Sequence, residues 1–135
     1  LSKYNKVNAL VINASELRQE LRSRDGNIQK LTANLKQVSK LKNILVTKGK
    51  DGAILINQKN KLYECPAFAN NVVDKVGAGD TLLALFSIFK ASRKFSDEVC
   101  LFVASLAAGY SVQNLANELS INKNFIIKSI QHLIK

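Results

Sequence analysis

The first part of the chain alternates short, almost uninterrupted apolar runs with a stretch of helical periodicity. Such runs predict strands that are buried on both faces. Four of them occur, at residues 7–12, 44–47, 53–56 and 62–65. Four apolar residues between the first two runs follow a helical spacing instead: Ile28, Leu31, Leu35 and Val38. This spacing predicts an amphipathic helix over residues 27–40 that covers one face of a sheet.

Turn-forming residues connect the later runs. Asp51-Gly52 separates the second run from the third, and the polar residues 58–61 separate the third from the fourth. Short connections of this kind predict antiparallel neighbours. The whole pattern predicts an α/β fold, with a mostly parallel sheet flanked by helices and a short antiparallel strand run.

Two helices are predicted further along the chain. Residues 81–91 and 99–112 are apolar on almost all sides, and Ser96 is a candidate N-cap for the second helix. Helices without a polar face are usually buried, so we expect both in the interior. Small residues in the second helix permit close approach, either of another helix or of a flat ring: Ala104, Ala107, Ala108 and Gly109.

Composition narrows the class of protein. With 135 residues, of which 47% are hydrophobic, the chain can form one domain with a sizeable core. No apolar run is long enough for a membrane span, and no signal-peptide hydrophobic region starts the chain, so we expect no membrane partner and a cytoplasmic location. The missing initial methionine suggests an excised part of a longer protein. The net charge of +10 would suit nucleic acid, but the lysines are scattered without interleaved aromatics, so no nucleic-acid partner is expected.

The densest candidate chemistry lies at Gly77-Ala78-Gly79-Asp80, between a short strand predicted at residues 72–73 and the apolar helix that follows. The first N–H groups of a helix lack intrahelical partners and lie at the positive end of its dipole. Glycines at this point let a phosphate come close to the backbone. Asp80 could accept a proton from a hydroxyl that attacks a bound phosphoryl group. An acid in a first turn is also ordinary complementation of the helix dipole, so this alternative stays open.

The segment Asp74-Lys75-Val76-Gly77-Ala78-Gly79-Asp80 resembles the C-terminal signature of the ribokinase/PfkB family of carbohydrate kinases, in which threonine usually replaces Lys75. The resemblance spans nearly all 135 residues and implies a partial ribokinase-like domain, residues 1–135, without its N-terminal substrate and lid portion. It implies ATP-dependent phosphoryl transfer to a sugar or sugar-phosphate hydroxyl. Asp80 would be the general base, and the amides of Gly77, Ala78, Gly79 and Asp80 would form the anion hole. With Lys75, the pattern further resembles heptose-phosphate kinase domains fused to nucleotidyltransferases.

The resemblance also implies two cation sites. Asn13 and Glu16 have the spacing of a helix capping box, and they match the family's Asn-x-x-Glu motif, which helps to hold Mg²⁺ largely through water. Asp74 and the carbonyl of Val76 would help to bind a monovalent cation such as K⁺. The ammonium of Lys75 could partly substitute for that cation.

Nucleotide contacts are implied in two further places. Thr47, Gly49 and Gly52 fit ordinary turn chemistry, and they resemble the family's Thr-x-Gly-x-x-Gly segment, which lines the nucleotide site. Ser105 and Ala108 fall where the related kinases have a helix that borders adenine, with Ser105 in place of a frequent asparagine. The implied partners are ATP, a sugar or sugar phosphate, and the missing N-terminal half of the domain. A homodimer is compatible with this reading.

Two other functions compete with a kinase. Leu115, Ala116, Leu119 and Ile121 with the later isoleucines resemble a helix-turn-helix, and Lys123 and Lys128 are available for DNA phosphates. Ser120 stands where such a turn often has glycine, and a C-terminal amphipathic helix explains the same pattern. A non-catalytic nucleotide-binding scaffold, made from half of a kinase, is the other alternative.

Overall fold

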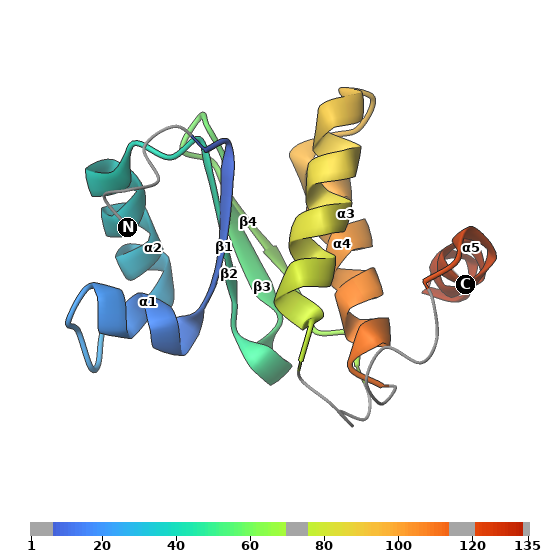
Figure 1. The fold of residues 1–135 in the computed structure, drawn as a ribbon, viewed down its shortest axis with the longest axis horizontal. Coiled ribbons are helices and arrows are strands. Elements are labelled where there is room, and N and C mark those ends of the chain that lie inside the picture. The colour runs from blue at the N-terminus through green and yellow to red at the C-terminus, as the bar shows by residue number, and fades with distance from the viewer. Residues whose placement is uncertain (1–6, 70–75, 114–120, 134–135) are drawn as a thin grey trace.

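A mixed four-stranded sheet forms the middle layer of the computed structural model, which describes residues 7–69, 76–113 and 121–133 (Figure 1). The strands are β1 (Ala9–Asn13), β2 (Asn43–Thr47), β3 (Ala53–Ile56) and β4 (Leu62–Cys65), in this order across the sheet. β1 and β2 are parallel, whereas β2–β3 and β3–β4 are antiparallel. The predicted α/β architecture and antiparallel run are confirmed. The described sheet itself is mixed, because β1–β2 is its one parallel pair; the predicted strand at residues 72–73 lies outside the described residues.

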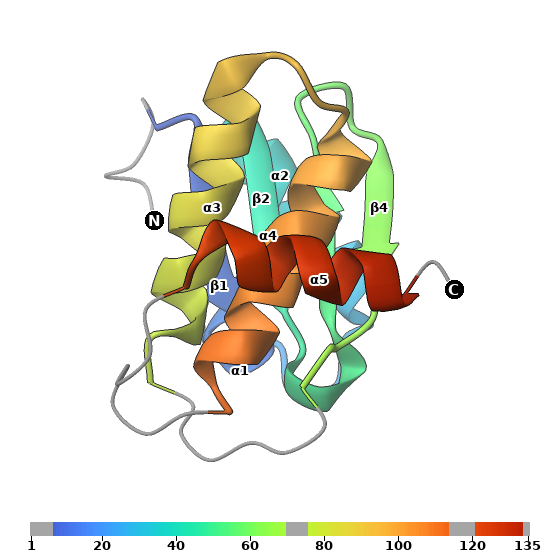
Figure 2. The same cartoon turned by 90° about the vertical axis from the view of Figure 1, so that its right-hand side faces the viewer.

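Helices cover both faces of the sheet (Figure 1). α1 (Ala14–Glu20) and α2 (Ile28–Ser39) lie on one face, and α3 (Ala78–Ser92) and α4 (Asp97–Ser111) on the other. α5 (Lys123–Leu133) crosses the outside of α4 (Figure 2). The ring centroids of Tyr110 on α4 and Phe125 on α5 lie 3.8 Å apart. In the described parts of the chain, none of the helices combines the length and apolar content that a membrane crossing requires.

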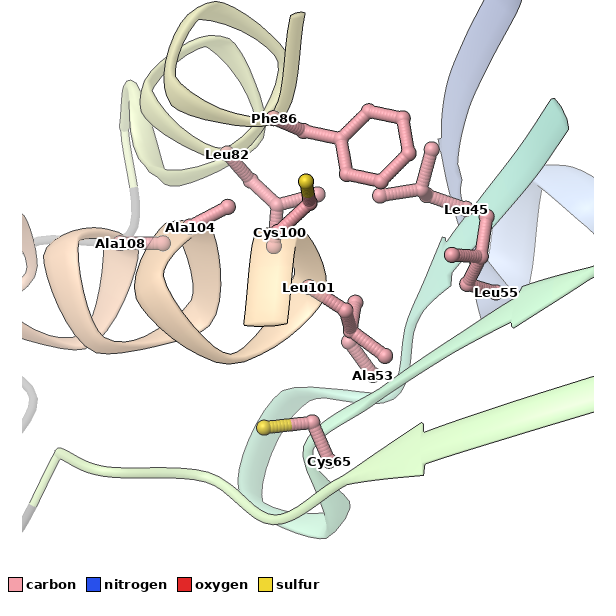
Figure 3. Close-up of a cluster of buried hydrophobic side chains, with 10 residues drawn as sticks. All are labelled: Leu45, Ala53, Leu55, Cys65, Leu82, Phe86, Cys100, Leu101, Ala104 and Ala108. Atoms are coloured by element: carbon pink, nitrogen blue, oxygen red, sulfur yellow. The ribbon is translucent and has the colours of Figure 1, made fainter. Parts of the chain in front are cut away.

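The inner strands are buried on both faces, which explains their continuous apolar sequences. Leu45 and Leu55 point toward α3 and α4, where they meet Leu82, Phe86 and Leu101 in one core cluster (Figure 3). The alternate residues of the same strands form a second cluster with α1 and α2, which contains Ile44, Val46 and Ile54 with Leu17 and Leu35. Each strand residue therefore belongs to one of two cores according to its position in the pleat.

α2 confirms the predicted amphipathic helix, with one correction at its end. Asn27 caps the helix through hydrogen bonds from the amides of Gln29 and Lys30 to its side-chain oxygen. Val38 was predicted to face the sheet, but it is 66% exposed, while Ser39 is buried. At about 100° per residue, position 39 returns to the face of residue 28, whereas position 38 lies about 80° away from it.

α3 corrects a second expectation. The apolar sequence predicted burial on all sides, but only Leu82 and Phe86 are buried, and Ile88 is 64% exposed. The reason is its position above β1, which is an edge strand of the described sheet. In the described part of the chain, no further strand or helix covers this side. α4, which lies inside the molecule, is buried along most of its length, as predicted.

Candidate functional site

The carboxyl ends of the two parallel strands place several of the predicted site residues at one end of the sheet. Asn13 ends β1 directly opposite Thr47, which ends β2. The start of α3, the 3₁₀ turn η2 (Gly49–Asp51) and the start of α1 lie at this same end (Figure 1). We call this place the strand-end corner and define it by Asn13, Thr47 and residues 77–80. Ligands of open α/β sheets commonly bind at such strand ends.

The first turn of α3 presents free backbone donors to the corner. Gly77 is the N-cap with φ of 84°, and no side-chain hydrogen bond caps the helix. Its carbonyl accepts a hydrogen bond from the amide of Thr81 at 2.9 Å. The amides of Ala78, Gly79 and Asp80 are the donors that an α-helix leaves without internal acceptors. The chain therefore turns an uncapped helix N-terminus, with its partial positive charge, toward the strand ends.

Space and a carboxylate accompany these donors. Among the residues that the structure describes, a Cβ placed on Gly79 would meet Val11 Cγ1 at 3.9 Å and no other atom outside the backbone of its own helix within 4 Å, so no described side chain fills this position. Asp80 is exposed in the first helical turn, and its side chain does not enter the core. An anion at the amides and a proton acceptor beside it can be accommodated together.

Asn13 and Glu16 form a complete capping box at the start of α1. Asn13 Oδ1 accepts from the Glu16 amide at 2.8 Å, and Glu16 Oε2 accepts from the Asn13 amide at 2.9 Å. The helix capping that explains this Asn-x-x-Glu pair without any metal is therefore formed in the structure. It uses one oxygen of each side chain and leaves Glu16 Oε1 without a hydrogen bond among the described residues. A metal role would depend on that second carboxylate oxygen, which suits Mg²⁺ as a hard oxygen ligand.

In the turn between β2 and β3, backbone conformation and packing are sufficient to explain one of the two glycines, Gly52. Gly52 has φ of 81°, and a Cβ there would lie 2.0 Å from the carbonyl oxygen of Cys65. Gly49 has φ of 61°, but no atom of the described ranges lies within 4 Å of its Cβ position. A hydrogen bond from the Lys48 amide to the Gly52 carbonyl, at 2.7 Å, closes the turn. Gly52 is thus required by packing, while Gly49 faces open space beside Thr47.

A polar link that the sequence patterns did not reveal supports this turn. Gln29 on α2 donates to Glu64 Oε1 on β4 at 2.9 Å, and Lys48 Nζ lies 3.5 Å from the same oxygen. The hydrogen bond from Gln29, together with the Lys48 charge, holds the pKa of Glu64 below its usual value. The three residues are far apart in sequence, so only the alternation in β4, which turns Glu64 outward, hinted at an exposed acid.

The residues predicted to border adenine are buried in α4. Ser105 and Ala108 are 7% and 8% exposed, and Ala108 belongs to the core cluster between α3, α4 and the sheet. The Ser105 hydroxyl lies near the Cys65 thiol, but it has no well-formed hydrogen bond in the described parts of the chain. Burial raises the pKa of that thiol. The adenine contact stays a prediction.

The predicted monovalent-cation site is only partly described. Asp74 and Lys75 lie outside the described residues. Val76 is described, and its side chain is 75% exposed just before the Gly77 cap. Three positions of the predicted helix-turn-helix pattern, Leu115, Ala116 and Leu119, also lie outside the described residues, as does Ser120 at its turn. The later part of the pattern lies on α5, which packs against α4.

Comparison with known proteins places this geometry in context. The sequence profile of pfkB family carbohydrate kinases matches residues 1–123. The bifunctional protein HldE of Helicobacter acinonychis is 33% identical over 110 residues, which make up 79% of this chain and 24% of that protein. Arabidopsis thaliana ribokinase complexed with ribose and ATP superposes with a TM-score of 0.78 at 28% identity, over 92% of this chain and 41% of that one.

A more distant structure has the same fold. Phosphofructokinase-2 from Escherichia coli in complex with potassium gives a TM-score of 0.81 at 17% identity, over 99% of this chain and 43% of that one. The chain therefore spans about a quarter of the matched HldE protein and less than half of the matched structures. The predicted ribokinase-like fold is confirmed.

Proposed function

Since this chain belongs to the pfkB family of carbohydrate kinases, we propose that it is the nucleotide-binding and catalytic-base part of an ATP-dependent sugar kinase. The observation that carries the proposal is the uncapped start of α3 at the strand-end corner, with the exposed carboxylate of Asp80 in the same turn. The matched Arabidopsis ribokinase was solved with ribose and ATP, which supports these ligand classes for a relative of the same fold.

At the strand-end corner, the backbone amides would bind the phosphates, and the Asp80 carboxylate would accept the proton. The amides of residues 77–80 would hydrogen-bond phosphate oxygens, where fixed dipoles meet the charge that develops during transfer. ATP, when bound, supplies the activated phosphoryl group. The oxygen of the acceptor hydroxyl would form a bond to the γ-phosphorus while the bond from that phosphorus to the diphosphate oxygen of the leaving ADP breaks. Asp80 would take the proton that the hydroxyl loses in this step.

The neighbouring strand ends would complete the nucleotide site. Thr47 and Gly49 lie beside the corner, and the open space at Gly49 would let a nucleotide approach the backbone there. Glu16 would bind Mg²⁺ or its water shell through Oε1, because its other oxygen is held in the capping box. Asn13 would act mainly by keeping that carboxylate in place. A K⁺ ion near Val76 and Asp74, and adenine near Ser105 and Ala108, remain parts of the proposal that rest on the family pattern.

The acceptor site would come from another part of the domain. β1 lies at the edge of the described sheet and contains four successive apolar residues. A hollow of about 660 Å³ lies along it, between Leu10–Ile12 on one side and residues of α1 with Arg22 on the other. An apolar edge of this kind suits a further strand of the sheet. The resemblance of the Asp74–Asp80 pattern, with its Lys75, to heptose-phosphate kinase domains supports a heptose phosphate as the first acceptor to test.

Asp80→Asn in the enzyme that contains this chain tests the proposal. The amide keeps the shape of the side chain but cannot accept the proton, so we expect kcat to fall by about 10²–10⁴ while KM for ATP changes little. Asp25→Asn, which alters an exposed acid in a turn away from the corner, is the matched control. Turnover near that of the wild type in Asp80→Asn would show that the base is another group.

A further inference from the structure

A second hollow lies at the opposite end of the sheet from the strand-end corner. Its volume is about 550 Å³, and its apolar floor includes Leu41, just before β2, and Ile56, the last residue of β3. β2 runs from this end to Thr47 at the corner. At about 3.3 Å per residue, the two places are separated by roughly 13 Å along the strand. The hollow is therefore a separate site.

The polar groups that line this hollow are of one chemical kind. Three are lysines and three carry carboxamides, and no carboxylate lines it: Lys36, Lys40, Lys42, Gln37, Gln58 and Asn60. None of the three lysines forms an ion pair with an acid among the residues that the structure describes. Ammonium and amide N–H groups are the donors that bind anions, above all phosphate oxygens.

Lys36 is already fixed in the wall of the hollow. Lys36 is 9% exposed, and its ammonium donates hydrogen bonds to the backbone carbonyls of Leu41 and Lys42 at 2.7 and 2.8 Å. Neutral carbonyls satisfy two of its three N–H groups but do not neutralise its charge. Burial lowers the pKa of Lys36, which reflects a cation that lacks a compensating anion. An anion in the hollow would supply that compensation.

The backbone around the hollow is in an unusual conformation. Lys40 and Asn60 have φ of 57° and 60°, and they are two of the four non-glycine residues with positive φ in the described ranges. Side chains other than glycine and asparagine rarely adopt this left-handed conformation. It turns the chain sharply after α2, so that Lys40 and Lys42 both border the same hollow.

From this arrangement we propose that the hollow is a second anion site, which binds a small phosphorylated molecule through Lys36, Lys40 and Lys42. Its size is within the range of about 300–1,000 Å³ that small-molecule sites occupy. The three amide side chains would hydrogen-bond the phosphate or neighbouring hydroxyls, and the apolar floor would contact the body of the ligand. This site does not rest on the proposed kinase function.

Titration of the 135-residue chain with inorganic phosphate and with pyrophosphate tests the proposal. Amide ¹H–¹⁵N spectra at constant ionic strength should show saturable shifts for residues 36–42 and 57–61, apart from any shifts at residues 77–80. Lys40→Gln/Lys42→Gln should raise Kd at these amides about tenfold. Both lysines are exposed, so the spectrum of the variant should remain that of a folded chain. Lys123→Gln/Lys128→Gln on α5 removes the same charge and should change Kd less than twofold.

Three outcomes would overturn the proposal. The first is a set of amide shifts that grows with anion concentration without saturating. The second is an equal loss of affinity in the two double variants. Either result would indicate general attraction of anions to a basic protein. The third is a shift of the same amides by single-stranded RNA while phosphate and pyrophosphate leave them unmoved. That result would assign the surface to a polynucleotide.

Discussion

Replacing Gly52 with alanine should destabilise the turn between β2 and β3 strongly. The new Cβ would lie 2.0 Å from the Cys65 carbonyl oxygen and 2.8 Å from Pro66 Cα, and both are backbone atoms that cannot move aside alone. Gly52 also has φ of 81° and ψ of −141°, a region that costs a side-chain-bearing residue about 1–3 kcal/mol. Relief of the clash requires β4 to shift from β3, which adds about 1–3 kcal/mol. We expect a total loss of about 2–6 kcal/mol.

Gly49→Ala is the matched control in the same turn. Its φ of 61° carries a penalty of about 1–2 kcal/mol, but the described residues place no atom within 4 Å of the added Cβ. Urea unfolding of both variants, followed by circular dichroism, measures the difference directly. If Gly52→Ala lost no more stability than Gly49→Ala, packing against β4 would not be the reason for the second glycine. ATP titration of the same variants separates the roles, because Gly49→Ala should weaken nucleotide binding more than its modest loss of stability explains.

Two further predictions concern polar groups. Asn13→Ala should cost about 1 kcal/mol in urea unfolding because it removes the cap on the Glu16 amide. Asn13→Ser should recover most of this loss, and a failure to recover it would contradict the capping explanation. Burial opposes ionisation of Asp97, but bonds from Lys90 and Asn57 outweigh it and hold its pKa below the usual value. A lowered pKa in the folded state gives stability that is lost as pH falls below about 4, so the wild type should lose more stability than Asp97→Asn between pH 7 and pH 3.

The elements that depend on local patterns could be predicted from the sequence. The continuous apolar runs of β2 and β3 follow from burial on both faces, and the caps Asn13 and Ser96 follow from side-chain chemistry within three residues. The start of α3 at the Gly77–Asp80 turn could be predicted because glycines just before an apolar run mark a turn into a helix. Its role as an anion site stays a prediction. Each of these signals is contained within one short segment.

Features that depend on which elements become neighbours could not be predicted. Ser39 rather than Val38 faces the sheet because the rotation of α2 is set by its packing on β2 and β3. The exposure of Ile88 on α3 depends on the position of β1 at the sheet edge, which its own apolar sequence did not indicate. The Gln29–Glu64–Lys48 link joins three elements across the sheet, and no spacing in the sequence connects them.

ATP titration of Gly79→Ala beside the wild type, with thermal unfolding of both, tests the central claim about the amides of residues 77–80. The added methyl fits the described part of the chain, where Val11 Cγ1 is the one neighbour within 4 Å, and alanine favours a helix over glycine by about 1 kcal/mol. A helical Cβ leans toward the N-terminus, so this methyl would stand over the free amides and hold a phosphate away. We predict a higher melting temperature together with ATP affinity at least tenfold weaker. A more stable variant that binds ATP as tightly as the wild type would contradict the account.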